Sequence, residues 1–215
     1  MRTMGTTKEL NRFLCSEIKK RKAPTIAICG QDSVAVGMDE KAEITVNGNA
    51  GDFFGALNNG ASIVLNGNAG RFAGDTMRNG KIIINGNCGE GAGMYMYGGQ
   101  IIVNGNAGDN IGQIGKGGTI LINGTAGDFV GLYLTGADII VLGDIGDNIG
   151  DWMIKGRIFV GKNIGSIGNN TILHKLNNDD RKFLKTLFVN NDIQFPLDKI
   201  RKIVPKELRP FYKGE

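Results

Sequence analysis

The residues best suited to chemistry are the glycines of residues 48–55, GNAGDFFG, which directly follow a short apolar segment. A glycine-rich turn after a strand can hold a phosphate when a helix begins behind it and presents free amide groups. No helix pattern follows this turn, and the motif returns at residues 67–74 as GNAGRFAG. We therefore predict that these glycines shape the backbone and do not bind a nucleotide.

Other groups that could take part in catalysis are isolated in the sequence. The single histidine, His174, has no serine or cysteine placed beside it by a motif, so we predict a packing or capping role for it. Asp128 and Asp147 would lie about 5 Å apart on neighbouring strands, but repetition alone explains that spacing. A calcium-binding nonapeptide repeat needs an aspartate in every copy, and Arg71 interrupts the column. The sequence predicts no catalytic, cofactor-binding or metal-binding residue in this chain.

The cysteines and the apolar content point to a cytoplasmic protein. Cys15, Cys29 and Cys88 form no CxxC pair, and an odd number argues against a disulfide framework or a zinc ribbon, so we expect buried, reduced thiols. No apolar run approaches the roughly 18 residues that a membrane helix needs. Residues 1–22 carry charges throughout, unlike a signal peptide. We therefore expect a cytoplasmic location and no membrane partner.

The formal net charge of +4 is unevenly distributed along the chain. Residues 175–215 carry ten basic and six acidic side chains, whereas residues 44–174 carry seven and nine. A nucleic-acid-binding protein would place a basic face with interleaved aromatic residues on its folded body. The distribution argues against a nucleic-acid partner.

The glycine motif belongs to a repeat of 19 residues. Three glycine columns spell G-x-x-G-x-x-x-G six times: Gly48, Gly67, Gly86, Gly105, Gly124, Gly143; Gly51, Gly70, Gly89, Gly108, Gly127, Gly146; and Gly55, Gly74, Gly93, Gly112, Gly131, Gly150. Four residues ahead of the first glycine stands isoleucine: Ile44, Ile63, Ile82, Ile101, Ile120, Ile139 and Ile158. A period near twenty, with a β-branched run and glycine turns in each row, is typical of a β-solenoid. We predict an all-β parallel β-helix of about seven to eight 19-residue rungs, with irregular rungs at residues 28–37 and 158–168.

The strand columns assign the faces of each rung. The isoleucines and the column two residues on are always apolar and must point inward; the second column is Val46, Leu65, Ile84, Val103, Ile122, Val141 and Val160. The column before the isoleucines is polar and must face water: Glu43, Ser62, Lys81, Gln100, Thr119, Asp138 and Arg157. Between the two inward columns, an apolar stripe is expected on the outside of the rod: Val64, Ile83, Ile102, Leu121, Ile140 and Phe159, with Thr45 at its start. Monomers seldom expose such a patch, so either the chain's own tail or N-terminal helix covers it, or a partner does.

Two polar columns follow the strands. NGN recurs in four rows, and its amides are expected to stack in hydrogen-bonded ladders that fix the register; they are Asn47, Asn66, Asn85 and Asn104, with Asn49, Asn68, Asn87 and Asn106. A charged column of mixed sign indicates a solvated face: Asp52, Arg71, Glu90, Asp109, Asp128 and Asp147.

The segments that flank the repeat are predicted to cap its two ends. Residues 1–23 are predicted to form an N-terminal capping helix with Thr6 or Thr7 as N-cap, and residues 24–172 the β-helix domain. Residues 173–215 are predicted to form a C-terminal helical tail, with one amphipathic helix in NNDDRKFLKTLF and one helical turn between Pro205 and Pro210. Such caps would cover the open strand edges of a solenoid.

The six in-register G-x-x-G-x-x-x-G rows resemble the GXGXG domain, a right-handed β-helix at the C-terminus of the large subunit of glutamate synthase. A related domain forms one of the subunits of formylmethanofuran dehydrogenase. The resemblance covers about residues 24–170. The ending RKIVPKELRPFY is similar to the VMP-[KR]-[DE]-Y ending of glutamate synthase chains, with Leu208 in place of the tyrosine. The opening is similar to stand-alone versions of this domain.

The resemblance implies a non-catalytic scaffold subunit of a complex that makes glutamate from glutamine and 2-oxoglutarate. Its partners would be the glutaminase and FMN-binding synthase subunits, and FMN and an iron–sulfur cluster would lie on those partners, with none bound by this chain. The alternative is the corresponding subunit of a molybdenum or tungsten enzyme like formylmethanofuran dehydrogenase; a stand-alone hydrolase is a third, remote hypothesis. Docking is expected through the outer stripe and the MYMY segment at residues 94–97, which could equally pack locally. Self-association is left open.

Overall fold

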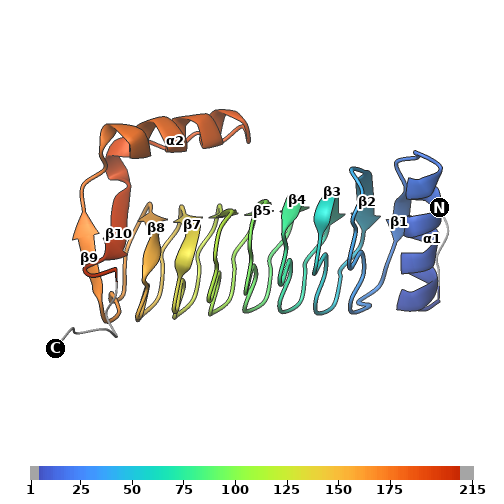
Figure 1. Cartoon of the computed structure of the whole chain (residues 1–215), viewed down its shortest axis with the longest axis horizontal. Helices are drawn as coiled ribbons and strands as arrows, with labels where there is room; N and C mark the ends of the chain where they lie inside the picture. The colour runs from blue at the N-terminus through green and yellow to red at the C-terminus, as the bar shows by residue number, and fades with distance from the viewer. Residues whose placement is uncertain (1–4, 209–215) are drawn as a thin grey trace.

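The isoleucine column of the repeat lies along the middle of a parallel β-sheet. In the computed structural model, which describes residues 5–208, eight strands stack in sequence order along a rod (Figure 1). They are β1 (Thr25–Ala27), β2 (Glu43–Asn47), β3 (Asn59–Asn66), β4 (Asn79–Ile84), β5 (Gln100–Val103), β6 (Thr119–Ile122), β7 (Thr135–Val141) and β8 (Lys155–Val160). Through most of the rod each strand residue pairs with the one 19 positions later, as Ile63 does with Ile82. The predicted parallel β-helix is confirmed.

The irregular rungs lie where the sequence places them. The amide of Ile28 donates to the carbonyl of Asn47 at 2.9 Å, so the degenerate first rung joins the stack. At the other end Ile149 bridges Ile167, a spacing of 18 residues, which is the predicted slip by one. Both ends of the repeat therefore continue the coil in altered register.

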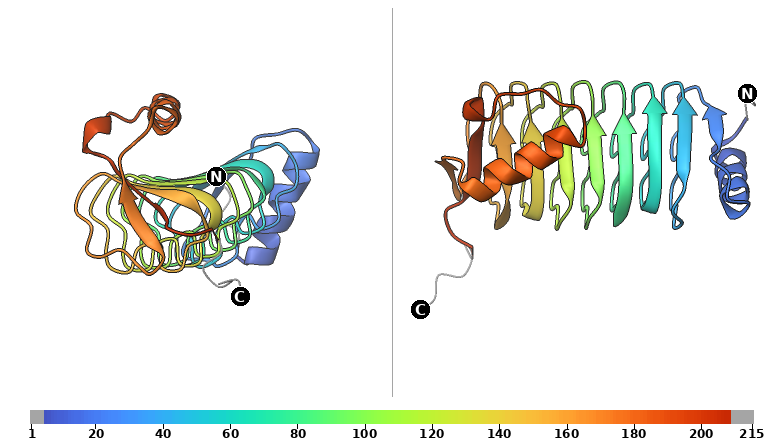
Figure 2. Two further views of the ribbon diagram at one scale, coloured as in Figure 1. Left: turned by 60° about the vertical axis from the view of Figure 1, so that its left-hand side comes forward. Right: turned by 90° about the horizontal axis from the view of Figure 1, so that it is seen from above.

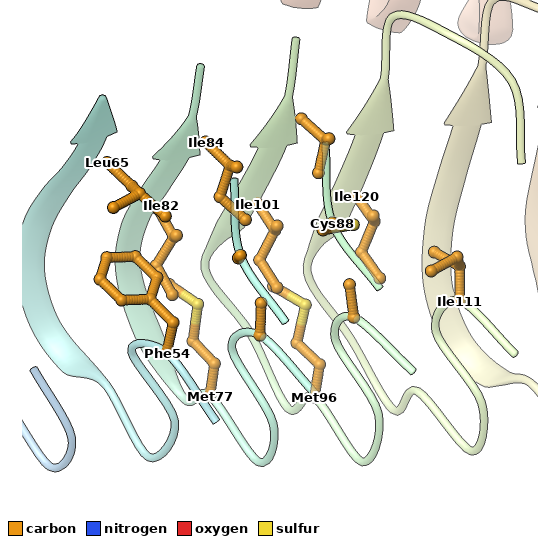
Figure 3. Packing of buried hydrophobic residues seen from close by; sticks show 14 of the residues in the cluster. Phe54, Leu65, Met77, Ile82, Ile84, Cys88, Met96, Ile101, Ile111 and Ile120 are labelled. Atoms are coloured by element: carbon orange, nitrogen blue, oxygen red, sulfur yellow. The ribbon is translucent and has the colours of Figure 1, made fainter. Parts of the chain in front are cut away.

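The core of the rod is filled from two sides. The inward strand columns are almost fully buried, with Ile44 1% and Val46 0% exposed. Phe54, Met77 and Met96 point from the loops toward the strand isoleucines (Figure 3). These loops, which we call the corner loops, therefore lie across the core from the strands.

The asparagine ladders form as predicted. Nδ2 of Asn66 donates to Oδ1 of Asn47 at 2.7 Å, and the same bond repeats up to Asn123. In the second column the side chain of Asn49 accepts instead from the backbone amide of Asn68, at 2.9 Å. The glycines between them permit close stacking: a Cβ on Gly70 would lie 2.7 Å from the carbonyl carbon of the preceding rung's Gly51.

The N-terminal end is closed by α1 (Thr7–Lys19). Thr6 is its N-cap and forms a capping box with Glu9, which satisfies amide groups of the first turn. Leu10 and Leu14 are 0% exposed against the first rung. The predicted capping helix is therefore present.

The C-terminal tail contains more than the helix predicted for it. It comprises β9 (Thr171–His174), α2 (Asn178–Val189), a short 3-10 helix η1 (Leu197–Lys199) and β10 (Arg201–Pro205). β10 inserts between β8 and β9 and is antiparallel to both. The predicted helical turn between Pro205 and Pro210 is wrong for residues 206–208, which form a bend; residues 209 and 210 lie outside the described part of the chain. The backbone here is held to Asn170 instead: the amide of Lys206 donates to the Asn170 carbonyl at 2.8 Å, and the Asn170 side chain bonds both the amide and the carbonyl of Glu207.

Candidate partner-docking surface

The outer apolar stripe is covered by the chain's own tail. α2 crosses over the strands, as the view from above shows (Figure 2), and Ile102, Leu121, Ile140 and Phe159 are at most 3% exposed beneath the tail. They pack against a row of tail residues: Leu184, Leu187, Phe188 and Ile200. Val64 and Ile83, at the other end of the stripe, are half-buried. Docking of a partner on the stripe, which the sequence favoured, is therefore wrong for the four residues beneath the tail.

Ion pairs fix this tail to the rod. Arg157 of β8 contacts Asp138 of β7 at 2.6 Å and Asp180 in the first turn of α2 at 3.1 Å. Its guanidinium also lies 4.6 Å from the ring centroid of Phe183. Lys202 of β10 pairs with the other oxygen of Asp180. The sequence predicted that Asp138 and Arg157 face water; instead they are half-buried and anchor α2.

Asp180 is the centre of this network, which we call the tail latch: Asp138, Arg157, Asp180 and Lys202. The Asp180 side chain is 2% exposed. Burial raises the pKa of its carboxyl, but the hydrogen bonds from Lys202, from the backbone of Asn177 and from Arg157 outweigh burial and lower the pKa below its usual value. The carboxylate therefore stays ionised and holds helix, strand and rod together.

The corner loops carry two columns of residues with left-handed backbone. In each rung from β2 to β7, φ at these positions lies between +52° and +71°. The first column is Phe53, Phe72, Gly91, Asn110, Phe129 and Asn148, and the second is Leu57, Thr76, Tyr95, Ile114, Tyr133 and Trp152. Glycine and asparagine accept this conformation readily, whereas a bulky side chain in it is strained by about 1–2 kcal/mol. Large apolar side chains nevertheless occupy most of these positions.

Five of these strained side chains are also exposed, whereas Phe72, Ile114 and Trp152 are half-buried. Phe53, Leu57, Tyr95, Phe129 and Tyr133 are 37–48% exposed. The rings of Phe53 and Phe72 stack with centroids 5.1 Å apart, which joins the surface across these two rungs. We call the large side chains of the two columns, together with Tyr97, the corner ridge: Phe53, Leu57, Phe72, Tyr95, Tyr97, Ile114, Phe129, Tyr133 and Trp152. Because it combines strain with exposure, the corner ridge is the candidate docking surface.

The MYMY segment divides between core and ridge. Met96 is 0% exposed and packs inside the rod, whereas Tyr95 and Tyr97 are exposed by 43% and 48%. The hydroxyl of Tyr97 accepts a hydrogen bond from Nζ of Lys116 at 2.9 Å, which lowers the pKa of the phenol. The local-packing interpretation is therefore confirmed for Met96, and docking through Tyr95 and Tyr97 stays a prediction.

The corner ridge lies opposite the tail. A Cβ on Gly55, in a corner loop, would lie 2.7 Å from Cδ1 of Ile82, so the corner loops contact the inner face of the strands. α2 covers the outer face of the same strands. The rod thus has one face sealed by its own tail and an aromatic face on the far side of its core.

The candidate chemical groups are arranged for structure. Amide groups of the glycine motif already donate to the neighbouring rung, as Gly70 does to the carbonyl of Gly51 at 3.0 Å, so they are not free to hold a phosphate. Asp128 accepts from the amide of Asp147 at 2.8 Å. Burial raises the pKa of the Cys88 thiol to about 12, but Cys15 and Cys29 are exposed, contrary to expectation. His174 is exposed on β9, so the packing alternative is wrong for it, and the capping alternative stays a prediction.

Residues 5–208 contain neither a candidate metal site nor a helix able to cross a membrane. Within them, no three histidine, cysteine, aspartate or glutamate side chains are grouped so that they could hold a metal ion. Neither α1 nor α2 is long and apolar enough to span a bilayer.

Sequence reasoning missed the corner ridge, although its signal was present. Phe53 and Phe72 stand 19 residues apart, and Tyr95 and Tyr133 stand two rungs apart in one column. The alternation of the strand columns gives no sign of these side chains, because their exposure depends on the geometry of the turns. Aromatic residues recurring at a position where other rungs carry glycine or asparagine were the available signal.

Comparison with known proteins agrees with this architecture. The sequence profile of the GXGXG motif family matches residues 19–186. A chain in the crystal structure of the formyltransferase/hydrolase complex from Methylorubrum extorquens with methylofuran aligns with a TM-score of 0.53 and 23% identity, over 69% of this chain and 67% of that one. No curated protein sequence gave a match. With most of its length matched, this chain belongs to the GXGXG motif family.

Proposed function

We propose that the chain is a non-catalytic scaffold subunit of a multi-subunit enzyme and that it docks a partner through the corner ridge. The observation that carries the proposal is the combination of strain and exposure at residues such as Phe129 and Tyr133, with φ of +55° and +52°. In a rod without a partner, glycine or asparagine at these positions would avoid the backbone strain, as Asn110 and Asn148 do. A partner surface gives those rings a function.

The first candidate complex is of the glutamate synthase type. Family membership and the RKIVPKELRPFY ending support it. The partners would then be glutaminase and FMN-binding synthase subunits in the cytoplasm, and FMN and the iron–sulfur cluster would be bound by those partners. The chain would hold the two parts in a fixed relation.

The second candidate is a complex related to formyl transfer. The structural neighbour comes from a formyltransferase/hydrolase complex crystallised with methylofuran, and that observation favours this candidate. The chain would occupy the place of the β-helical chain there. Both candidates assign the same scaffold role and differ in the enzymes attached.

Purification of the tagged chain from its own host tests the proposal. Three forms are compared: wild type, the double variant Phe129→Asn/Tyr133→Asn, and the control Val189→Asn, which removes a 69%-exposed apolar side chain from α2 on the other face. We expect stoichiometric enzyme subunits with the wild type and the control, and their loss with the ridge variant. Glutamine-dependent glutamate formation in the preparation identifies the first candidate, and formyl transfer the second. Equal recovery with all three forms would exclude the ridge as the docking surface, and purification of the wild type without other subunits would exclude the scaffold role.

A further inference from the structure

The corner ridge is bordered by a column of polar and charged residues on each side. Each corner loop enters the ridge directly after the charged column of the repeat, as Asp128 precedes Phe129. Two residues after the second ridge column, as Tyr97 follows Tyr95, the loop reaches another column. This later column is Arg78, Tyr97, Lys116, Thr135 and Lys155, of which the last is placed by its pairing with Thr135. The exposed aromatic surface therefore lies between two columns that carry charges.

The first half of the charged column neutralises itself. Oδ1 of Asp52 accepts from the backbone amide of Arg71 at 2.8 Å, and Oδ2 accepts from the guanidinium of Arg71 at 2.7 Å. Glu90 lies 3.8 Å from the same guanidinium on the next rung, and the ring centroid of Phe72 lies 5.7 Å from it. The chain thus shows how a guanidinium fits this column: between two carboxylates and beside the adjoining aromatic ring.

The second half of the column consists of three successive aspartates, which we call the acidic rim: Asp109, Asp128 and Asp147. Oδ1 of Asp109 accepts from the amide of Asp128 at 2.9 Å, and Oδ1 of Asp128 accepts from the amide of Asp147 at 2.8 Å. The backbone bonds are those of Asp52, but no arginine or lysine within residues 5–208 forms an ion pair with the rim. These carboxylates stand one rung, about 4.8 Å, apart and repel one another.

The later column carries the opposite charge, and we call its cations the basic rim: Arg78, Lys116 and Lys155. The Arg78 guanidinium lies 5.8 Å and Nζ of Lys116 lies 4.3 Å from the ring centroid of Tyr97. All three cations are exposed. No carboxylate in the described part of the chain pairs with them.

Two carboxylates lie between the rims, and neither compensates them. Asp75 is half-buried and accepts from the hydroxyl of Thr76 at 2.9 Å. Asp151 is also half-buried and accepts from the backbone amide of Asn169 at 2.7 Å and from its side-chain amide at 2.9 Å. The apolar ridge is left with one negative and one positive border.

We propose that the partner subunit meets the ridge with an apolar surface bordered by arginine or lysine opposite the acidic rim and by aspartate or glutamate opposite the basic rim. This inference rests on the docking role proposed above. Complementary charges around an interface set its orientation and its rate of association. Arginine suits the acidic rim, because a guanidinium on the Oδ2 atoms of Asp109 and Asp128 would also lie beside the ring of Phe129, as Arg71 lies beside Phe72. Since the rims differ in sign, they select one orientation of the partner across the rod.

Neutralising each rim separately tests the proposal. In the acidic-rim variant all three aspartates become asparagine, which keeps the Oδ1 atoms that accept backbone amides; in the basic-rim variant all three cations become glutamine. Tagged chains are purified from the host, and the partner recovered per chain is measured over a series of salt concentrations. We expect each variant to bind the partner about tenfold more weakly and with a smaller dependence on salt. A purely apolar contact predicts unchanged or stronger binding, because fewer charges lose their water.

Two substitutions outside the ridge serve as matched controls. Oδ1 of Asp144 accepts from the amide of Asn163 at 2.9 Å, so Asp144→Asn keeps the same kind of backbone bond at a position of the second asparagine column. Lys185→Gln removes an exposed cation from α2, on the other face of the rod. Both controls should bind the partner as the wild type does.

Carbodiimide cross-linking of the wild-type complex keeps the test decisive if a rim variant does not fold. This reagent joins a carboxylate directly to a neighbouring amine, and we expect it to join Lys116 or Lys155 to an aspartate or glutamate of the partner. Rim variants that hold the partner as firmly as the wild type, or rim lysines joined to no partner residue, would overturn the proposal. So would links from these lysines to the acidic rim of a second copy, recognised in complexes of isotopically light and heavy chains, because they would assign the ridge to self-association.

Failure of this inference is distinguishable from failure of the docking role. If Phe129→Asn/Tyr133→Asn loses the partner while both rim variants keep it, the ridge docks through its apolar side chains alone and only the charge complementarity is wrong. If Phe129→Asn/Tyr133→Asn keeps the partner, or the wild type recovers none, the docking role itself is wrong.

Discussion

Replacing Phe129 by glycine and by alanine isolates the strain of the corner ridge. Both changes remove the ring, which is 37% exposed, so both lose the same aromatic contacts. They differ in how the remaining residue accepts a φ of +55°. Glycine adopts this conformation freely, whereas a Cβ makes it unfavourable by about 1–2 kcal/mol.

The expected order of stability is therefore the reverse of the usual one. Glycine has more freedom to lose on folding, which at an ordinary position makes it about 0.5–1 kcal/mol less stable than alanine. At Phe129 the relief of strain exceeds this loss, and we expect the glycine variant to be more stable than the alanine variant by about 0.5–1 kcal/mol. The control is Val64, a half-buried residue in the middle of β3, where alanine should be the more stable.

Urea unfolding at 25 °C measures these differences, provided that the slope m is the same for each pair. Both Phe129 variants should also lose partner binding to the same extent, because both lack the ring. An alanine variant as stable as the glycine variant would refute the claim that the ridge is strained, and the proposed docking role would lose its main support.

Three further changes test the tail and the ladders. Asp180→Asn leaves Lys202 and Arg157 without their shared carboxylate and should lower the free energy of unfolding by about 3 kcal/mol in urea titrations at pH 7. Since the pKa of Asp180 is lowered in the folded chain, its contribution to stability is complete above the unfolded value near 4 and is lost as pH falls through the folded value. Thermal midpoints of wild type and variant should therefore begin to converge below about pH 4 and meet only below the folded pKa. Ile102→Asp places a charge under α2 and should release the tail to limited proteolysis; a tail as resistant as that of the wild type would contradict its burial. Asn85→Ala removes two exposed ladder bonds and should cost about 1 kcal/mol each in the same titration, whereas a loss below about 0.5 kcal/mol in all would mean that the ladder sets register without stabilising.

The rungs were predictable because their signal is local and repeated. Ile63 and Ile82 stand at the same place in consecutive rows, and a parallel coil is the arrangement that brings them into register. The caps were predictable for a similar reason, since Thr6 and Asn177 precede amphipathic segments and begin the helices there. Each of these inferences needs only residues within one or two rows.

The parts that were missed depend on contacts between distant segments. Ile203 lies 45 residues after Ile158 and pairs with it in an antiparallel sense that no repeat announces. The prolines after it suggested a helical turn, but local preference is weaker than the burial that pairing provides. The apolar stripe was predicted, but its cover was left open between the chain's own tail, the N-terminal helix and a partner, because an outward apolar column does not say which segment will cover it.

The ridge was hidden for a different reason, which bears on function. A left-handed Phe53 or Tyr95 runs against local preference, so reasoning from propensity places such residues elsewhere. Local backbone preference, hydrophobic pattern and packing usually favour the same structure, and the exceptions are expected at functional or strained sites. On the strand face, α2 covers the apolar side chains, and the ion pairs of Asp180 hold α2 in place. On the opposite face the apolar side chains of the corner ridge are strained and uncovered, and the docking partner that we propose would account for the two observations together.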